Sequence, residues 1–275
     1  MAKPQLTNAA RPATFEVEAY NERGEMVPTA IAGEHPLTLY LDKREIVTLM
    51  TLGHAPEALA IGYLRNQRLA DSIDDIAAVQ VDWETESVAI TTHSKRPLPS
   101  LDKRTVTSGC GQGTVYGDLM EEIDSIQLRK DVTLGDADLF VLLEKVRRHE
   151  TIYKQAGAVH GCALASTAGD ILMFVEDVGR HNAVDAIAGF MWLDAVDGSD
   201  KVFYTTGRLT SEMVIKCAQM RIPFLVSRSG LTHMGHEIAR KVGITMLGRA
   251  SGRHYLAFTG KERLVRTAPQ PTALA

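Results

Sequence analysis

Four short segments of the chain combine glycine and arginine with small polar residues. They run from Glu176 to Asn182, from Thr206 to Ser211, from Ser227 to Gly230 and from Gly248 to His254. A guanidinium group is a rigid fork of donors that suits phosphate oxygens, and glycine lets a ligand approach the backbone closely. Together the four segments predict a pocket for a phosphorylated ligand.

The candidate ligand-binding residues in these segments are Gly179, Arg180, His181, Asn182, Gly207, Arg208, Ser227, Arg228, Ser229, Arg249, Ala250, Ser251, Gly252, Arg253 and His254. Taken one at a time, such loops are better explained by arginines that tie loops together and by residues that cap helices. Four of them at successive strand ends reverse that preference and favour the pocket. The chain has neither a P-loop nor a complete G-x-G-x-x-G, which argues against an ATPase and against an ordinary dinucleotide dehydrogenase.

The chain has three cysteines, Cys110, Cys162 and Cys217, with no C-x-x-C spacing. An odd, widely spaced set argues against a disulfide framework and against a four-ligand zinc site. Cys162 lies in an apolar run, and Cys217 lies on a helical stripe with Met213 and Met220. We therefore expect both thiols to be buried and to act as small hydrophobic side chains.

Cys110 has a different setting, because Gly109, Gly111 and Gly113 surround it. Such a loop leaves the thiol open to another protein, and nearby cations would lower its pKa and make it a nucleophile. The residues alone leave two readings open, a reactive thiol and a buried turn cysteine.

Several classes of site and partner are not expected. The pairs His149-Glu150 and His236-Glu237 lack the Pro-Cys-x-x-Cys of a zinc deaminase, and H-E-x-x-H is absent, so no metal site is expected. The net charge is 30 − 34 = −4, which gives no overall basic field for nucleic acid or anionic lipid. No apolar run of about 18 residues predicts a membrane span. Without a signal-peptide pattern, a cytoplasmic location is expected.

The elements that must position these residues follow from periodicity. In the first half we expect strands near Glu16 to Ala19 and Leu37 to Leu41, a helix from Pro56 to Arg65, a short helix from Asp71 to Val79 and a strand from Val81 to Thr91. The polar stretch from His93 to Gly113 is expected to be the loop that carries Cys110.

The second half predicts strands and helices in alternation. After a helix from Asp136 to Gln155, apolar runs occur at Ala158 to Ala165, Ile171 to Val175, Val202 to Thr205, Pro223 to Val226 and Ile244 to Leu247. Helical segments separate the later runs: Asn182 to Leu193, Ser211 to Met220 and His236 to Val242. This rhythm predicts right-handed βαβ units on a largely parallel sheet. The four arginine loops would then meet at its carboxyl edge.

Three stretches of sequence carry a resemblance to a known family: EDVGRHNAVD at 176–185, TGRLTSEMV at 206–214 and IPFLVSRS at 222–229. With them the chain resembles, from about Phe15 to Phe258, the formate dehydrogenase accessory sulfurtransferases, or FdhD family. The resemblance implies an α/β protein with a smaller N-terminal α+β domain, residues 15–130, which carries the Cys110 loop. It also implies a C-terminal three-layer α/β/α domain, residues 131–265, that is similar to the cytidine deaminase fold without its zinc.

The resemblance also implies a function. Such proteins receive sulfur from a cysteine desulfurase as a persulfide, here on Cys110. They pass it to the bis(molybdopterin guanine dinucleotide) molybdenum cofactor of the formate dehydrogenase catalytic subunit. The guanine nucleotides and phosphates of that cofactor suit the arginine loops, a guanine nucleotide would mimic it, and the family's C-terminal contacts match Arg249 to His254. The family further implies a homodimer.

The sequence departs from the family pattern at two places. The family loop usually reads Cys-Gly-x-Cys-Gly, whereas Gly113 stands here at the second cysteine, and the usual Phe-Ala-Arg-Gly is replaced by Arg249 to Gly252. Three hypotheses follow: a sulfur carrier that uses Cys110, a cofactor-binding chaperone without sulfur transfer, and a metal-dependent nucleotide-modifying enzyme.

Overall fold

Two sheets and the helices between them organise the computed structural model, which describes residues 3–94, 126–149 and 151–266. The elements of the first range are β1 (Gln5–Leu6), β2 (Thr14–Tyr20), β3 (Met26–Ala32), β4 (His35–Leu41), β5 (Arg44–Thr51), α1 (Pro56–Asn66), β6 (Ile76–Asp82) and β7 (Ser87–Thr92). Those after it are β8 (Leu134–Gly135), α3 (Asp136–His149), α4 (Ile152–Ala156), β9 (His160–Ser166), β10 (Ile171–Asp177), α5 (Arg180–Leu193), β11 (Lys201–Thr205), α6 (Ser211–Gln219), β12 (Phe224–Ser227), α7 (His233–Val242), β13 (Thr245–Ser251), β14 (His254–Ala257) and β15 (Leu264–Val265).

The C-terminal sheet has the strand order β10-β9-β11-β12-β13-β14 and is mixed. Strands β11, β12 and β13 are parallel, and α6 and α7 connect them. β9 is antiparallel to both of its neighbours, and β14 is antiparallel to β13. The expected largely parallel sheet is therefore correct only for its central strands, because short turns join β9 to β10 and β13 to β14 as hairpins. Since β10 runs in the same direction as β11, the carboxyl ends of β10 to β13 still share one edge.

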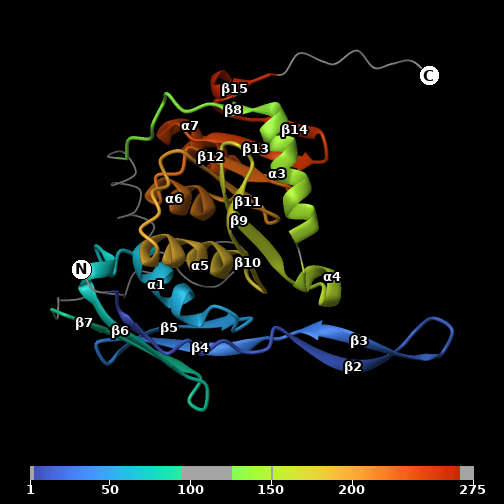
Figure 1. Ribbon diagram of the computed structural model, residues 1–275, viewed down its shortest axis with the longest axis vertical. Helices are drawn as coiled ribbons and strands as arrows, with labels where there is room; N and C mark the ends of the chain where they lie inside the picture. The colour runs from blue at the N-terminus through green and yellow to red at the C-terminus, as the bar shows by residue number, and fades with distance from the viewer. Residues whose placement is uncertain (1–2, 95–125, 150, 267–275) are drawn as a thin grey trace.

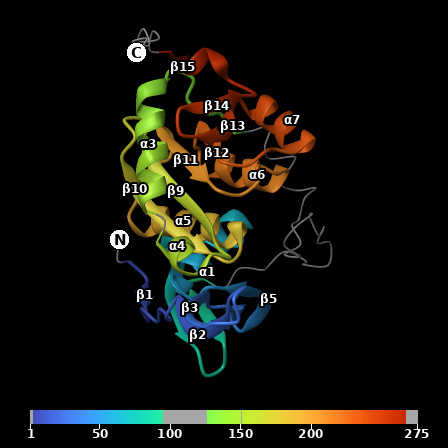
Figure 2. The same cartoon turned by 90° about the vertical axis from the view of Figure 1, so that its right-hand side faces the viewer.

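Helices cover both faces of this sheet. On one face Leu139, Leu142 and Val146 of α3 pack against strand residues such as Tyr204. On the other face α5, α6 and α7 enclose a second, larger core, and Figure 2 shows α3 on the opposite side of the strands from α6 and α7. The expected α/β class is confirmed, while the likeness to the cytidine deaminase fold stays a prediction.

The N-terminal sheet, of order β1-β6-β7-β4-β5, meets the C-terminal part where α1 packs on α5 (Figure 1). A Cβ atom added to Gly62 would lie 1.6 Å from the Asp185 carbonyl oxygen, and one added to Gly189 would lie 1.9 Å from that of Ala58. The two helix backbones are thus in direct contact, and one hydrophobic core runs through both parts. The division at residue 130 stays a prediction.

Two expected elements of the first half are wrong. The segment from Asp71 to Val79 holds a 3-10 turn at Ile73–Asp75 before β6 begins. The single strand expected from Val81 to Thr91 is instead the end of β6, a turn at 83–86 and most of β7, which form a hairpin. Alternating buried Val79 and Val81 follow the period of a strand. In addition, the expected helix from Asp136 to Gln155 is two helices, α3 and α4.

The hairpin of β2 and β3 forms a separate two-stranded sheet that extends from the rest of the chain (Figure 1). Within the described ranges, no helix is long and apolar enough to cross a membrane.

Candidate functional site

The structure brings the loops after β10, β11, β12 and β13 to one edge of the C-terminal sheet. The Arg228 backbone nitrogen donates to the Thr205 carbonyl oxygen at 3.1 Å, and the Arg249 nitrogen donates to that of Ser229 at 2.9 Å. The buried Ser227 hydroxyl donates to the Gly207 carbonyl oxygen at 2.6 Å. These bonds fix the loops relative to one another. We call the edge of the sheet that the four loops form the arginine edge.

Arg180 is the first residue of α5, and it is only 6% exposed. Its aliphatic part packs on Gly207, where an added Cβ atom would lie 2.7 Å from the Arg180 Cδ. The guanidinium Nε and Nη2 have no hydrogen-bond partner among the described residues. A buried charge without partners is costly, so this position favours an anion that would complete it.

His160, the first residue of β9, lies among the arginine charges. Its Nδ1 is 3.3 Å from the Thr206 hydroxyl oxygen. Burial lowers the pKa of His160, and the charges of Arg180, Arg228 and Arg208 lower it further. Three guanidinium groups thus act on one half-buried, neutral imidazole, which is an arrangement suited to phosphate groups.

The sequence reasoning missed His160, because it stands at the start of an apolar run. Its place depends on the antiparallel register of β9, in which His160 pairs with Asp177 and Cys162 pairs with Thr205. No local signal in the sequence reveals that register.

Arg208 and Arg228 are exposed at the same edge. The Arg228 guanidinium carbon lies 5.4 Å from the centre of the Tyr153 ring on α4. Glu176, the first residue of the 176–185 stretch, holds α4 there by accepting hydrogen bonds from the backbone nitrogens of Ile152 at 2.9 Å and Tyr153 at 3.0 Å. Glu176 therefore positions a neighbour of the arginine edge.

Asn182 contacts the N-terminal part of the chain instead of open space, and Gly179 shares its carboxylate partner, Asp177. The Asn182 Nδ2 donates to the Met50 carbonyl oxygen at 2.6 Å and to the Asp177 Oδ1 at 2.8 Å. The Gly179 nitrogen donates to the same carboxylate at 3.0 Å, and Thr51 donates to its other oxygen at 2.6 Å. Burial raises the pKa of Asp177, although these hydrogen bonds oppose the shift. The N-terminus of α5 thus already faces a carboxylate of the protein.

His181 belongs to a buried polar network between α1, α5 and α6. Its Nδ1 is 3.5 Å from the Glu212 Oε1, and burial, with Lys216, lowers its pKa to about 3. The Lys216 Nζ donates to the Asp185 Oδ2 at 2.8 Å, and the Asn66 Nδ2 donates to the Asp185 Oδ1 at 2.7 Å. The imidazole is therefore neutral and enclosed. No local pattern in the sequence indicates this network.

The segment from Arg249 to His254 forms the end of β13, a turn and the start of β14. Arg249 lies beside Ser229 through its backbone, whereas Ala250 is buried against α3. The Arg253 guanidinium carbon is 5.7 Å from the centre of the Phe140 ring on α3. The remaining members, Ser251, Gly252 and His254, are exposed at the turn. The predicted ligand contacts of this segment, like those of Gly179, His181 and Asn182, stay predictions.

The two cysteines of the second half are confirmed as buried free thiols. Burial raises the pKa of Cys162 to about 12 and raises that of Cys217 well above its ordinary value. Both are therefore inert at neutral pH. Cys110 lies outside the described residues.

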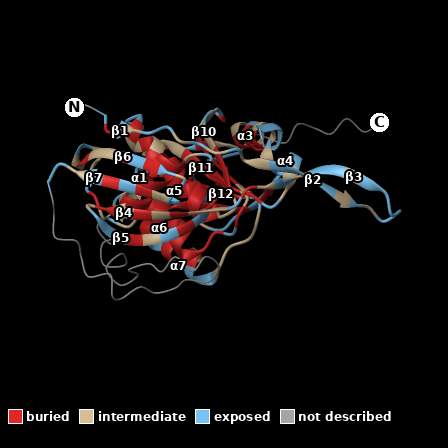
Figure 3. Cartoon of the chain, turned by 90° about the horizontal axis from the view of Figure 1, so that it is seen from below, coloured by how far each residue is buried: buried red, intermediate tan, exposed pale blue. Residues whose placement is uncertain are grey.

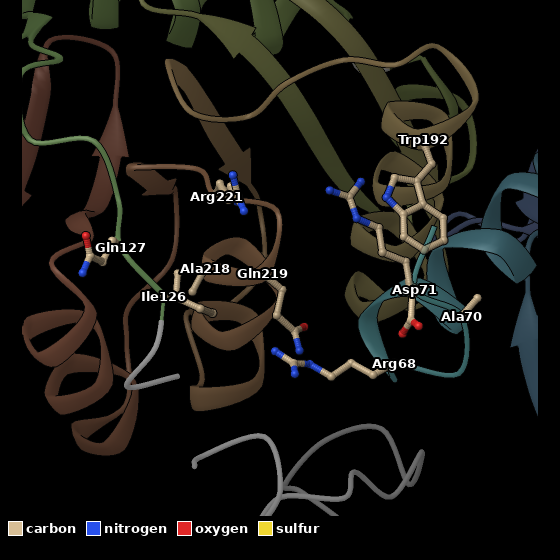
Figure 4. A pocket seen from close by; sticks show the side chains of 10 residues that line it. Arg68, Ala70, Asp71, Ile126, Gln127, Trp192, Ala218, Gln219 and Arg221 are labelled. Atoms are coloured by element: carbon tan, nitrogen blue, oxygen red, sulfur yellow. The ribbon is translucent and has the colours of Figure 1, made fainter. Parts of the chain in front are cut away.

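A hollow of about 870 Å³ lies away from the arginine edge, at the C-terminal ends of α1, α5 and α6 (Figure 4). It is lined by Arg65, Arg68, Ala70, Asp71, Ile126, Gln127, Trp192, Ala218, Gln219 and Arg221. The Arg65 Nη1 donates to the Ala188 carbonyl oxygen at 2.9 Å, and its guanidinium lies over Trp192. A cation at these helix ends offsets the carbonyl dipoles, so this hollow is a poorer anion site than the arginine edge.

Comparisons with known proteins agree on one family. The model of the FdhD/NarQ family matches residues 32–265. The sulfur carrier protein FdhD of Listeria innocua is 28% identical over 254 residues, which cover 91% of this chain and 95% of that protein. The protein of the same name from Shouchella clausii is 30% identical over 242 residues, 85% of this chain and 89% of that protein.

A solved structure supports the same relationship. A crystal structure from Desulfotalea psychrophila, provisionally assigned as a formate dehydrogenase accessory protein, has a TM-score of 0.75 and 25% sequence identity to this chain. The match covers 92% of this chain and 100% of that one.

Proposed function

Because the chain belongs to the FdhD/NarQ family, we propose that it is a sulfur carrier that serves formate dehydrogenase. The observation that carries this proposal is the family match over residues 32–265, whose relatives are named sulfur carrier proteins. The arginine edge supports it, because it offers cations to a phosphate-rich cargo.

The proposed sulfur donor is a cysteine desulfurase, and the proposed carrier is Cys110. The Cys110 thiolate attacks the outer sulfur of the desulfurase persulfide. A new S–S bond forms on Cys110, the old S–S bond breaks, and the desulfurase cysteine leaves as a thiolate. Cys162 and Cys217 do not compete, because burial keeps both thiols protonated and enclosed.

The proposed acceptor is the bis(molybdopterin guanine dinucleotide) molybdenum cofactor, bound as cargo. Arg180, Arg208 and Arg228 would bind its phosphate oxygens, and neutral His160 would add a hydrogen bond without adding charge. The Arg180 nitrogens that no described residue contacts by a hydrogen bond fit this role, since a buried guanidinium gains most from an anion. A homodimer, a cytoplasmic location and a likeness to the cytidine deaminase fold complete the proposal.

One sequence feature favours a second candidate, a chaperone that holds the cofactor without transferring sulfur. Gly113 stands where the family usually has a second cysteine. A single thiol suffices for the exchange written above, whereas a relay between two thiols is impossible in this loop.

Formate dehydrogenase activity in cells separates the two candidates. A strain that lacks its own carrier would be supplied with the wild-type chain, Cys110→Ser or Arg180→Ala. A sulfur carrier restores activity only with Cys110 present, and Arg180→Ala reduces the restored activity. If Cys110→Ser restores activity as fully as the wild type, the chaperone candidate replaces the carrier.

A further inference from the structure

The β2–β3 hairpin is a two-stranded sheet whose main contact with a described helix is with α4, mainly through β3. Neither strand pairs with any other described strand, and no residue of either strand is buried. Figure 3 shows the hairpin reaching beyond the buried interior, with β3 largely exposed. Isolated hairpins are only marginally stable in water, so a partner that covers this one would stabilise it.

The register shows which backbone groups are open. The Gly33 nitrogen donates to the Ala13 carbonyl oxygen at 2.8 Å, and the Asn21 nitrogen donates to that of Glu25 at 3.0 Å. Hydrogen-bonded pairs alternate with non-bonded pairs in an antiparallel ladder. The pairs Glu16/Ala30 and Glu18/Pro28 are therefore non-bonded, and their backbone groups point away from the hairpin.

The two open edges consequently differ. On β3 the outward position at residue 28 is a proline, which has no N–H and interrupts the edge. On β2 Glu16 and Glu18 both present an N–H and a carbonyl group. A third strand can therefore add to β2 with a complete ladder, and to β3 only with a missing hydrogen bond.

The faces of β2 define the chemistry of such a strand. Phe15, Val17 and Ala19 share one face, next to Val27 and Ile31 of β3. Phe15 is 44% exposed and Ile31 is 48% exposed, whereas Val17, Ala19 and Val27 are half-buried, so part of this face is open apolar surface.

The other face of β2 carries the carboxylates of Glu16 and Glu18. Among the described residues, neither has a hydrogen bond or an ion pair, and β2 and β3 contain no basic residue. A strand that alternates apolar and basic residues complements both faces.

A second copy of the chain fits this edge poorly. If two copies are related by a two-fold axis, their β2 strands pair antiparallel. Depending on the register, Glu16 of one copy then lies opposite Glu18 of the other, or one of these two residues lies opposite its own counterpart. Like charges directly opposite one another destabilise a strand pair. Charge therefore opposes self-pairing at β2.

We propose that the β2 edge is a docking site for an extended segment of another protein, one in which apolar and basic residues alternate. The segment adds to β2 as an antiparallel or parallel third strand, which is the β-augmentation mode of recognition. This inference is independent of the sulfur chemistry and of the arginine edge.

A labelled peptide, Lys-Val-Lys-Val-Lys-Val-Lys, tests the proposal by fluorescence anisotropy with the full chain. Glu18→Pro removes an outward N–H and a carboxylate while leaving the ladder to β3 intact, and we expect about tenfold weaker binding. Glu18→Gln keeps the N–H and should weaken binding by about threefold, with a smaller dependence on salt. Ala30→Pro is the matched control on the β3 edge, where binding should stay within about twofold.

Three outcomes would overturn the proposal. The first is a wild-type chain that does not bind the peptide, and the second is equal weakening by Ala30→Pro and Glu18→Pro. The third is a wild-type dimer in sedimentation that Glu18→Pro dissociates, because the occupant of the edge would then be a second copy.

Discussion

The arginine edge and the junction between α1, α5 and β5 use the same stretch of sequence, residues 176–185, in opposite ways. In the junction each buried carboxylate has partners: Asp177 accepts from Thr51 and Asn182, and Asp185 accepts from Lys216. At the arginine edge the buried Arg180 keeps two nitrogens that have no hydrogen-bond partner in the described part of the chain. A residue proposed to bind a ligand is thus interleaved with residues that hold the fold, and only their hydrogen bonds tell them apart.

The largest expected effect comes from removing the ion pair between Lys216 and Asp185. Lys216→Met leaves the Asp185 carboxylate buried without its cation, which should lower the free energy of unfolding by about 3–5 kcal/mol. Urea unfolding measures this loss. Adding Asp185→Asn removes the stranded charge and should recover at least about 1 kcal/mol. If Lys216→Met alone is as stable as the wild type, the ion pair of Lys216 and Asp185 does not stabilise the junction.

The second prediction concerns the helix contact. Gly189→Ala places a Cβ atom 1.9 Å from the Ala58 carbonyl oxygen, so α1 and α5 must separate. We expect a loss of about 3 kcal/mol in the free energy of unfolding. Gly230→Ala is the control, because no atom of the residues that the structure describes lies within 4 Å of its Cβ position. It should change stability by less than about 0.5 kcal/mol. Equal effects of the two changes would contradict the close contact.

The third prediction concerns pH. The pKa of His181 is lowered to about 3 in the fold by burial, so only the unfolded chain takes up this proton near pH 6. Stability therefore falls as pH falls below about 6.5. Between pH 7.5 and pH 5 the wild type should lose about 2 kcal/mol more than His181→Gln. Parallel curves of unfolding free energy against pH for the two proteins would contradict a neutral, enclosed His181.

The smallest expected effect concerns ligand binding at the arginine edge. Arg180→Ala should weaken binding of guanosine diphosphate by about tenfold in calorimetry, while the fold stays intact. Arg253→Ala should have a smaller effect, because that guanidinium lies over Phe140 on α3. Unchanged affinity in Arg180→Ala would mean that the nucleotide binds elsewhere.

Periodicity predicted much of this fold. The helices that begin near Pro56 and Ser211 start where expected, and the arginine loops do meet at one edge. The short helix expected from Asp71 is wrong because Val79 and Val81 belong to β6, a strand that pairs with β1 and β7. These pairings join distant parts of the chain, so no local pattern predicts them. The place of His160 in the site was missed for the same reason, because it depends on the register of β9.

The roles within the site were less predictable than its location. Arg180 and Asn182 are two residues apart. Arg180 keeps a guanidinium that the described residues leave partly unpaired, whereas Asn182 binds Met50, 132 positions away. Sequence shows which residue types are present, whereas long-range contacts decide which of them remain available to a ligand.

Intact mass spectrometry after incubation with a cysteine desulfurase and cysteine tests the central claim most directly. The sulfur-carrier account predicts one added sulfur atom on the wild type and on Arg180→Ala, and none on Cys110→Ser. No sulfur is expected on Cys110→Ser because burial keeps Cys162 and Cys217 from reacting. An unmodified wild type, or an equal adduct on Cys110→Ser, would contradict it.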